Sequence, residues 1–368
     1  MNNDVEPLNR QLSRLHREVR DYFPFVVRIA VALYDSGTDE IKTFLCSPAD
    51  ATPLTDYRIV LARAAWLDSV RSSRRSRVIG NLTPAVLGDQ EHSTRILAAG
   101  YKASYTVPMF EDDRFRGFVF FDSDISEAFS ERVTQQLDLF VRVISLTIEN
   151  ALRSVDVLVG SLHLLREISR FRDVETSSHL SRMSYYAETI ARKIAPEIGR
   201  DEAWVEYMRL FAPLHDIGKI AMPDAILLKP SGLNESEFEV MKQHPVKGEE
   251  ILMTLIRDLS LNKMQYIDTL RHIARHHHER WDGRGYPDRL EGDRIPIEAR
   301  IIKIADVFDA LTSARCYKSA WMREEAEEFL SKRAGTEFDP RCVEIFLSRN
   351  DEITGIMQRF GESSEAAV

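Results

Sequence analysis

The second half of the chain concentrates residue types that bind metals. Of the ten histidines, seven lie between residues 179 and 278. The segment APLHDIGKI places His215 beside Asp216, and an imidazole nitrogen next to a carboxylate oxygen suits a divalent transition metal. An isolated His-Asp pair is common by chance, so a metal site requires further ligands elsewhere in the chain.

Further candidate ligands stand on separate predicted helices. Glu175 and His179 are four residues apart, which puts both on one helix face. Asp306 lies in a largely apolar helix, where a carboxylate has to be paired, hydrogen-bonded or bound to a cation. The candidate ligands are Glu175, His179, His215, Asp216, His244, His277, His278 and Asp306. One ion takes only about four to six ligands, so this set predicts at least two metals inside a helical bundle.

Other polar residues near this set have a simpler interpretation. We expect Asp309 to orient a metal ligand rather than to bind metal itself. His272 and His276 are one helical turn apart and could form a site of their own, but we assign both to the surface.

Helices that can position the ligands follow from the spacing of apolar residues. From about residue 167 onward the predicted helices are His179–Ile194, Glu202–His215, Glu235–His244, Gly248–Ile256, Tyr266–His277, Glu298–Leu311 and Arg323–Arg333. Proline and glycine residues separate them, and Pro245 is expected to end a helix just after His244. The C-terminal half is therefore predicted to be an all-α bundle.

The N-terminal half predicts a mixed domain of strands and helices. The expected elements are a helix over Leu8–Asp21, strands over Phe25–Tyr34 and Ile41–Cys46, a helix over Tyr57–Val70, and a hairpin of Tyr101–Met109 with Phe115–Phe121. Gly117, inside the last of these strands, indicates close approach by another backbone segment.

A long helix is predicted over about residues 130–172. Its apolar positions include Val133, Leu137, Phe140, Ile144, Ile148, Ala151, Val155, Leu158, Leu162 and Leu165. Such a helix either packs on its own domain or pairs with a second copy as a parallel dimer seam. We favour the seam, because the helix exceeds the usual length in globular proteins.

Three motifs in the C-terminal half, HDIGK, HHERWDGRGYP and ADVFDALTSARCYK, resemble the HD-GYP family within the HD superfamily of metal-dependent phosphohydrolases. The likeness runs from about Val174 to about Phe346. It implies hydrolysis of cyclic di-GMP, a bacterial second messenger, to pGpG or GMP. It also implies two or three divalent metal ions, with Fe as the first choice and Mn as the second.

Carried over by position, the resemblance implies roles for individual residues. The implied metal ligands are His179, His215, Asp216, His244, His277, His278 and Asp306, with Glu175 supporting a third metal. The residues implied to meet the substrate are Lys219, Tyr286, Arg315 and Lys318. The expected catalytic residues are His215, Asp216 and Lys219, acting with a metal-activated hydroxide on the phosphodiester. For the GYP loop, contact with substrate, contact with a protein partner and a purely structural role all stay open.

The N-terminal half resembles a GAF domain, through the strand-like VPMF, a polar turn and RGFVFFDS. The predicted organisation is an N-terminal helix (1–21), a GAF-like sensory domain (22–150), a connecting and dimerisation helix (130–172), an HD-GYP catalytic domain (173–350) and a C-terminal tail (351–368). The predicted fold class is thus an α+β GAF-like domain joined by a long helix to an all-α HD-type bundle. We expect the GAF-like domain to regulate the phosphodiesterase.

Composition limits the partners. Lys and Arg number 49 and Asp and Glu number 58 among the 368 residues, giving a net charge of −9, which argues against binding of a nucleic-acid polymer. No apolar run approaches the roughly 18 residues that span a bilayer, and three widely spaced cysteines indicate a reducing cytoplasm. Two alternatives to the phosphodiesterase stay open: a module that senses cyclic di-GMP for a protein partner, and an HD phosphohydrolase for another nucleotide.

Overall fold

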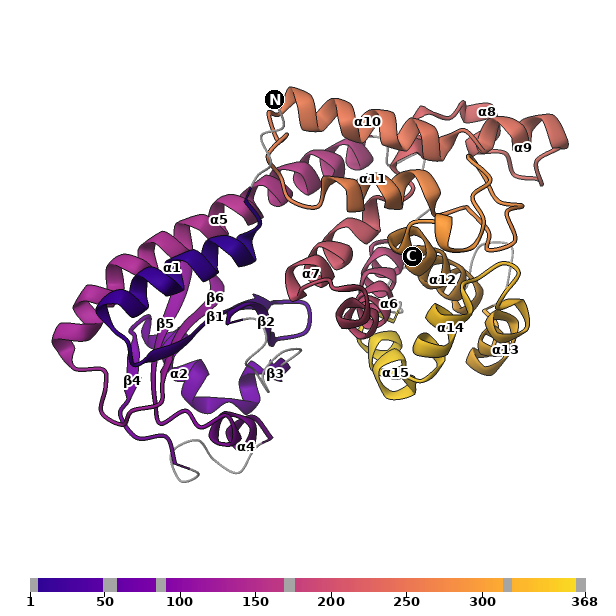
Figure 1. Ribbon diagram of the computed structural model, residues 1–368. Helices are drawn as coiled ribbons and strands as arrows, with labels where there is room; N and C mark the ends of the chain where they lie inside the picture. Colours follow the sequence, from indigo (N-terminus) through magenta and orange to yellow (C-terminus); the bar gives the residue numbers. More distant parts are fainter. Residues whose placement is uncertain (1–5, 49–57, 84–90, 169–175, 314–319, 362–368) are drawn as a thin grey trace, which may run out of the picture. The chain divides into compact units, whose positions relative to one another are not determined.

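The structure is a computed structural model that describes residues 6–48, 58–83, 91–168, 176–313 and 320–361 (Figure 1). The chain divides into two compact units, Met1–Arg153 and Ser154–Val368. Among the described residues, no helix combines the length and the apolar character needed to cross a membrane.

The first unit is built on an antiparallel sheet. In the described part of the chain its strands are β1 (Val26–Asp35), β2 (Glu40–Ser47), β3 (Arg58–Val60), β4 (Arg77–Ile79), β5 (Ala103–Glu111) and β6 (Arg114–Ser123). Their order across the sheet is β3-β2-β1-β6-β5-β4. Both predicted hairpins, β1 with β2 and β5 with β6, are present.

Helices cover both faces of this sheet. Figure 1 shows α1 (Leu8–Tyr22) and α5 (Glu131–Ile168) on one face, and α2 (Ala65–Ser73) with α4 (Glu91–Ala98) on the other. On the first face, His16 of α1 contacts the carbonyl of Val26 at 3.1 Å, and the Tyr105 hydroxyl donates to Asp138 of α5 at 2.6 Å. The α+β class predicted for this half is therefore confirmed.

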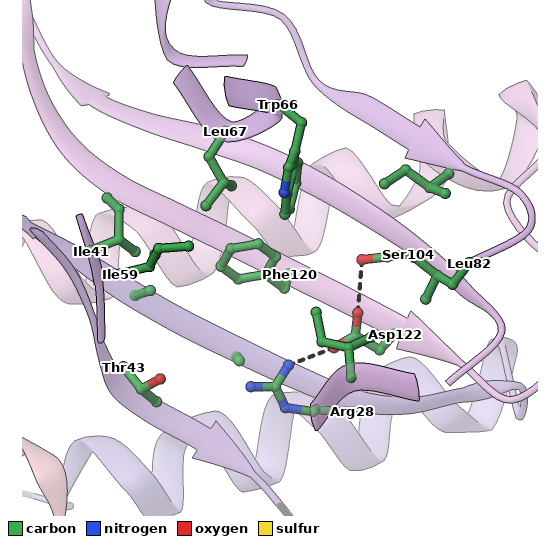
Figure 2. A pocket seen from close by; sticks show the side chains of 14 residues that line it. Arg28, Ile41, Thr43, Ile59, Trp66, Leu67, Leu82, Ser104, Phe120 and Asp122 are labelled. Carbon is green, nitrogen blue, oxygen red and sulfur yellow. Dashed lines mark hydrogen bonds and ion pairs between the residues drawn. The ribbon is translucent and has the colours of Figure 1, made fainter. Parts of the chain in front are cut away.

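A small cavity lies between the sheet and the α2 and α4 face (Figure 2). Its lining is mostly apolar, but Arg28 and Asp122 form a buried ion pair there at 2.6 Å, and Ser104 donates to Asp122 at 2.7 Å. The cavity volume is about 40 Å³. That volume holds a few water molecules but no organic ligand, because even benzene occupies a cavity of about 150 Å³.

One local prediction in the first unit is wrong, and one short strand was not predicted at all. The helix predicted over Tyr57–Val70 is a strand at Arg58–Val60, a 3-10 turn at Leu61–Arg63 and a helix only from Ala65. Residues 58–60 extend the sheet by pairing with β2, so edge pairing outweighs the helical spacing of the apolar residues. The sequence also gave no sign of β4, which is only three residues long and pairs with β5.

The second unit is helical, as predicted. Its helices are α6 (Ser177–Ile194), α7 (Glu202–Phe211), α8 (Asp224–Leu227), α9 (Glu235–Met241), α10 (His244–Asp258), α11 (Ile267–His276), α12 (Ile297–Thr312), α13 (Arg323–Arg333), α14 (Pro340–Leu347) and α15 (Asn350–Arg359). Its core contains fully buried aromatic side chains from four of them, namely Tyr186, Trp204, Phe308 and Phe346.

Prolines move several predicted helix ends. Helix α7 stops at Phe211, and the chain continues as 3-10 turns through Pro213, so the predicted helix up to His215 is too long. Pro245 stands in the first turn of α10, where a missing N–H is harmless, and therefore begins a helix instead of ending one. Residues 350–359, assigned above in large part to a tail, form α15, and its Ile353 is fully buried.

The long helix α5 spans 38 residues, and residues 169–172 of the predicted element lie outside the described ones. Leu137, Ile144 and Ile148, which were predicted to lie on a dimer seam, are buried within the chain. The side chains of Leu162 and Leu165 are also outside the described part. The large apolar residues that α5 does expose are Leu139, Val143, Leu146 and Val157. A seam on α5 would therefore use a different face from the predicted one.

The close approach predicted at Gly117 is confirmed. Gly117 has a φ of +148°, and a Cβ built on it would lie 1.9 Å from the carbonyl oxygen of Ala32 in β1. We expect Gly117→Ala to lower the free energy of unfolding by about 2–4 kcal/mol. Urea unfolding measures the loss, and hydrogen exchange of β1 and β6 assigns it to the first unit.

Gly100→Ala is the matched control for this prediction. Gly100 also has a positive φ, +79°, but no atom lies within 4 Å of the position its Cβ would take. The Gly100→Ala variant should therefore lose only about 1 kcal/mol of its free energy of unfolding, which is the cost of a positive φ for a residue with a side chain. Equal losses in the two variants would contradict the close-approach explanation.

Candidate metal centre

Two glycines bring the His215-Asp216 segment against α10. Gly218 lies in the 3-10 turn Ile217–Ala221, and a Cβ on it would lie 1.9 Å from the His244 carbonyl oxygen and 2.5 Å from the Gly248 nitrogen. Only a residue without a side chain permits this contact between backbones. The contact explains why Asp216 and His244, distant in sequence, have neighbouring side chains.

The first group of ligand atoms surrounds Asp216. Its Oδ1 lies 3.0 Å from His244 Nε2 and 3.4 Å from His277 Nε2. The two imidazole nitrogens are themselves 3.3 Å apart. His278 completes this group, in which one ligand atom from each residue lies within 4.8 Å of every other.

The second group consists of His179, His215 and Asp306, again with ligand atoms within 4.8 Å of one another. His215 Nε2 lies 4.0 Å from Asp306 Oδ1. It also lies 3.3 Å from Asp216 Oδ2. Because Oδ1 of the same carboxylate faces the first group, Asp216 joins the two groups.

Hydrogen bonds to the backbone fix the orientation of three of these histidines. Nδ1 of His215 contacts the Ala212 carbonyl at 3.0 Å, and Nδ1 of His244 contacts the Met241 carbonyl at 2.8 Å. Nδ1 of His277 contacts the carbonyls of the preceding helical turn at 3.0 and 3.1 Å. A carbonyl only accepts, so each Nδ1 donates and each Nε2 keeps its lone pair for the centre.

His179 is oriented by a side chain instead. Its Nδ1 lies 2.7 Å from Asp309 Oδ2, and both residues are buried. Arg182 holds the same carboxylate, with Nε 2.6 Å from Oδ1 and Nη2 2.9 Å from Oδ2. Arg182 also donates to Ser313 and to the Phe360 carbonyl at 2.8 Å, which ties α6 to α12 and to the end of α15.

These donors fit divalent cations. His244 and His277 point lone pairs at each other over 3.3 Å, which is repulsive without a positive charge between or beside them. Nε2 of His179 is buried and has no hydrogen-bond partner among the described residues, although such atoms are normally satisfied. Imidazole with carboxylate is the donor set of Fe, Mn and Zn sites.

The electrostatics agree with that assignment. Burial would raise the pKa of Asp216, but Lys219, whose Nζ lies 2.5 Å from Oδ2, leads the opposing interactions that bring this pKa well below its usual range. Burial lowers the pKa of His277 to about 4 and lowers that of His278 well below its ordinary value. An ionised carboxylate among neutral imidazoles is the protonation state that metal binding requires.

The GYP loop reaches the centre through Tyr286. The Tyr286 ring stacks on His278, with centroids 4.7 Å apart and planes 26° apart. Gly285 lets the loop fold back tightly, because a Cβ there would lie 2.3 Å from the Arg280 nitrogen. Of the other residues predicted to act in catalysis or binding, Glu175, Arg315 and Lys318 lie outside the described ones.

A buried carboxylate holds this loop in place. Glu279 accepts hydrogen bonds from the backbone N–H groups of Asp288 at 2.7 Å and Leu290 at 3.1 Å. The side chains of His276, Glu279 and Asp288 lie close enough together to resemble a third ligand group. The Asp288 carboxylate, however, already pairs with Arg275 at 2.7 and 2.9 Å. The group therefore stabilises the loop and does not fit a metal.

His272 keeps its surface assignment, with a side chain that is 34% exposed, whereas His276, at 13%, is more buried than predicted. The Nδ1 of His272 lies 3.3 Å from Glu298, and the Nδ1 of His276 lies 3.5 Å from Asp288. Both carboxylates lie outside α11, so the spacing of apolar residues within that helix could not predict these contacts.

Sequence reasoning also missed residues that support the centre. Arg182 could have been found, because it lies three residues after His179 on one face of α6. Glu279 directly follows the His277-His278 pair. Lys303, buried on α12 one turn before Asp306, gave no signal.

The helical unit is similar in sequence to known proteins. A protein-family model described as "HD domain" matches residues 172–342. The chain is 44% identical over 204 residues to the "Cyclic di-GMP phosphodiesterase response regulator RpfG" of Xanthomonas campestris, covering 55% of this chain and 51% of that protein. It is 38% identical to the "3'3'-cGAMP-specific phosphodiesterase 2" of Vibrio cholerae, covering 65% of this chain and 44% of that protein.

The chain spans about half the length of these curated relatives. Among solved structures, the GAF domain/HD domain protein from Geobacter sulfurreducens matches with a TM-score of 0.32 at 17% identity, covering 40% of this chain and 95% of that one. The family match coincides with the helical unit that carries both ligand groups. It agrees with the resemblance to the HD superfamily that the motifs between residues 172 and 342 carry.

Proposed function

We propose that this protein is a metal-dependent phosphodiesterase that hydrolyses cyclic di-GMP to pGpG or GMP. The observation that carries the proposal is the pair of adjacent ligand groups joined by Asp216, within an HD domain. The substrate class comes from relatives, several of which are named cyclic di-GMP phosphodiesterases. The motifs alone would also suit a sensing module, but the two assembled ligand groups favour catalysis.

The metal-binding residues divide between two ions, Fe or Mn. Asp216, His244, His277 and His278 would hold one, and His179, His215 and Asp306 the other, with Asp216 shared. Glu175 would support a third. Such ions, when bound, stabilise charge on phosphoryl oxygens and make water acidic enough to supply a nucleophile at neutral pH.

The chain's own residues orient the substrate. Lys219 stands 2.5 Å from Asp216 and is half-buried at the edge of the ligand groups, where its charge can stabilise a non-bridging phosphate oxygen. We assign Arg315 and Lys318 to the second phosphate, and Tyr286 to contact with the nucleotide. His215 and Asp216 would act as metal ligands, because an imidazole lone pair and a carboxylate repel a phosphate unless a cation is bound to them.

A second candidate substrate is 3'3'-cGAMP. The relative from Vibrio cholerae at 38% identity is named for it. The two dinucleotides differ only in one purine base, so the same two ligand groups would serve both.

We further propose that the first unit regulates the enzyme. The domain limits that we favour are a GAF-like sensory domain at 22–150, a connecting helix at 130–172 and a catalytic domain at 173–350. A protein contact at the GYP loop is the second regulatory surface, because that loop is held rigidly and reaches the centre through Tyr286.

The exposed face of α5 supports a homodimer. Leu139, Val143, Leu146 and Asn150 are exposed and spaced by four, three and four residues. That spacing puts Leu at d positions and Val and Asn at a positions of a heptad repeat. Leu at d with Val at a favours two parallel strands, and a single Asn at a fixes their register.

The function is tested by product analysis. Protein loaded anaerobically with Fe or Mn should convert cyclic di-GMP to pGpG or GMP, as resolved by chromatography, and 3'3'-cGAMP is assayed in parallel. Turnover of cGAMP alone would favour the second candidate. Absence of turnover with both dinucleotides and several metals would reject the phosphodiesterase.

The bridging role of Asp216 gives a second prediction. Asp216→Ala removes the carboxylate that joins both ligand groups, so bound metal should fall by at least one ion per chain and activity by at least about 100-fold. Elemental analysis and the product assay measure the two losses. Asp288→Asn is the control, because that carboxylate is held by Arg275 and should leave the metal count unchanged. Full metal content in Asp216→Ala would contradict the bridging role.

The dimer is tested by cross-linking. In a parallel pair, identical d positions face each other, so Leu146→Cys should form an interchain disulfide on oxidation. Ser145→Cys, on another side of α5, and the unmodified chain should not. Non-reducing electrophoresis detects the product, and analytical ultracentrifugation gives the mass of the native protein. A monomer at micromolar concentration, or equal cross-linking at both positions, would reject the seam.

A further inference from the structure

A row of aromatic rings runs outward from the candidate metal centre. His278 belongs to the first ligand group, and the Tyr286 ring stacks on it with centroids 4.7 Å apart. The next ring is Phe238 of α9, whose centroid lies 6.5 Å from that of Tyr286 with the planes at 80°. Rings from three parts of the HD domain thus form one surface that begins at the metal ligands.

The outer end of this row is open to solvent. Phe238 is 44% exposed, although large aromatic side chains usually hide most of their surface. A single exposed Phe is ordinary. Phe238 differs because it continues an aromatic surface that already starts at a functional centre.

A cation accompanies the two outer rings. Nζ of Lys242 lies 4.9 Å from the centroid of Phe238 and 5.9 Å from that of Tyr286. Glu239, one turn earlier, pairs with this ammonium at 2.5 Å and limits its freedom. An ammonium group beside an exposed ring face combines a stacking surface with a hydrogen-bond donor.

Helix α9 is held firmly enough to present this surface. Asn234 caps its first turn and Glu237 reciprocates in a capping box. Lys229 pairs with Glu237 at 2.5 Å. The position of Phe238 therefore follows from the fold of the preceding segment and does not require a bound partner.

We infer that Phe238 and Lys242, together with Tyr286, form a platform that binds one purine base of the dinucleotide while a phosphodiester lies at the ligand groups. This inference rests on the proposed function and extends it. Stacking on an aromatic ring contributes about 1–3 kcal/mol per base. The Lys242 ammonium can donate to N7 or O6 of guanine, which are acceptors on the exposed edge of that base.

The platform also orients the substrate. A base stacked on Phe238 fixes one end of a rigid cyclic dinucleotide, so the phosphate that reaches the ligand groups is set by the distance between platform and centre. The platform would favour purine dinucleotides over simple phosphodiesters, a preference that the metal ligands alone do not supply.

Three variants test the platform. Phe238→Ala should raise KM for cyclic di-GMP by about 5- to 150-fold, the equivalent of one lost stacking contact, with little change in kcat, because the contact is made equally in ground and transition states. Lys242→Met keeps the aliphatic stem and should raise KM less. Val240→Ala, on the same helix and 39% exposed, is the control and should change KM less than twofold.

Two further measurements separate base binding from a structural role. Hydrolysis of methyl p-nitrophenyl phosphate, a diester without a base, should be the same in Phe238→Ala and the unmodified protein. Binding of GMP by equilibrium dialysis should weaken in Phe238→Ala and stay unchanged in Val240→Ala. Equal losses on both diesters, or unaltered KM and GMP affinity, would overturn the platform.

GMP binding also distinguishes failure of this inference from failure of the proposed function. If the unmodified protein hydrolyses the simple diester but neither dinucleotide, the proposed substrate is wrong. In that case, weaker GMP binding by Phe238→Ala would still support the platform, and equal GMP binding would reject it. If Phe238→Ala left GMP binding unchanged and weakened only the binding of a protein partner, the surface would belong to that partner and the platform would be rejected.

Discussion

The contact between the Gly218 backbone and the first turn of α10 is the constraint on which the candidate centre depends. A Cβ at position 218 would lie 1.9 Å from the His244 carbonyl oxygen, so any other residue would push α10 away from the His215-Asp216 segment. Gly248 completes the contact from the side of α10. The 3.0 Å distance from Asp216 Oδ1 to His244 Nε2 exists because two backbones approach without side chains between them.

Around that contact, the supporting bonds decide what the histidines can do. Backbone carbonyls hold Nδ1 of His215, His244 and His277 and leave each Nε2 directed inward. His179 has a carboxylate partner instead, Asp309, whose charge is balanced by Arg182. A ligand supported by an ion pair couples more strongly to its surroundings than one supported by a carbonyl. Since Arg182 also holds the end of α15, the C-terminal helix contributes to the orientation of His179.

Much of this could be predicted from the sequence, because the informative signals were local. The HDIGK motif, the His277-His278 pair and the apolar spacing of the helices gave the bundle and the ligand types. The predictions that were wrong concerned contacts between segments that are distant in the sequence. Residues 58–60 have the apolar spacing of a helix, but they form a strand because they pair with the edge of β2. Leu137, Ile144 and Ile148 look like a dimer seam until their own sheet and helices bury them. Spacing identifies an apolar face but does not say what covers it.

The net charge of −9 illustrates the same limit for electrostatics. A whole-chain charge argues against an anionic substrate, yet the ligand groups place Asp216 and Asp306 where two divalent ions would outweigh them by about +2. Lys219 then adds positive charge where a phosphate would lie, and Lys242, whose charge Glu239 balances, offers a hydrogen-bond donor where a base would lie. A small anion responds to this local field, whereas a long polyanion meets the acidic remainder of the surface. The acidic composition therefore discriminates by the size of the ligand rather than by its sign alone.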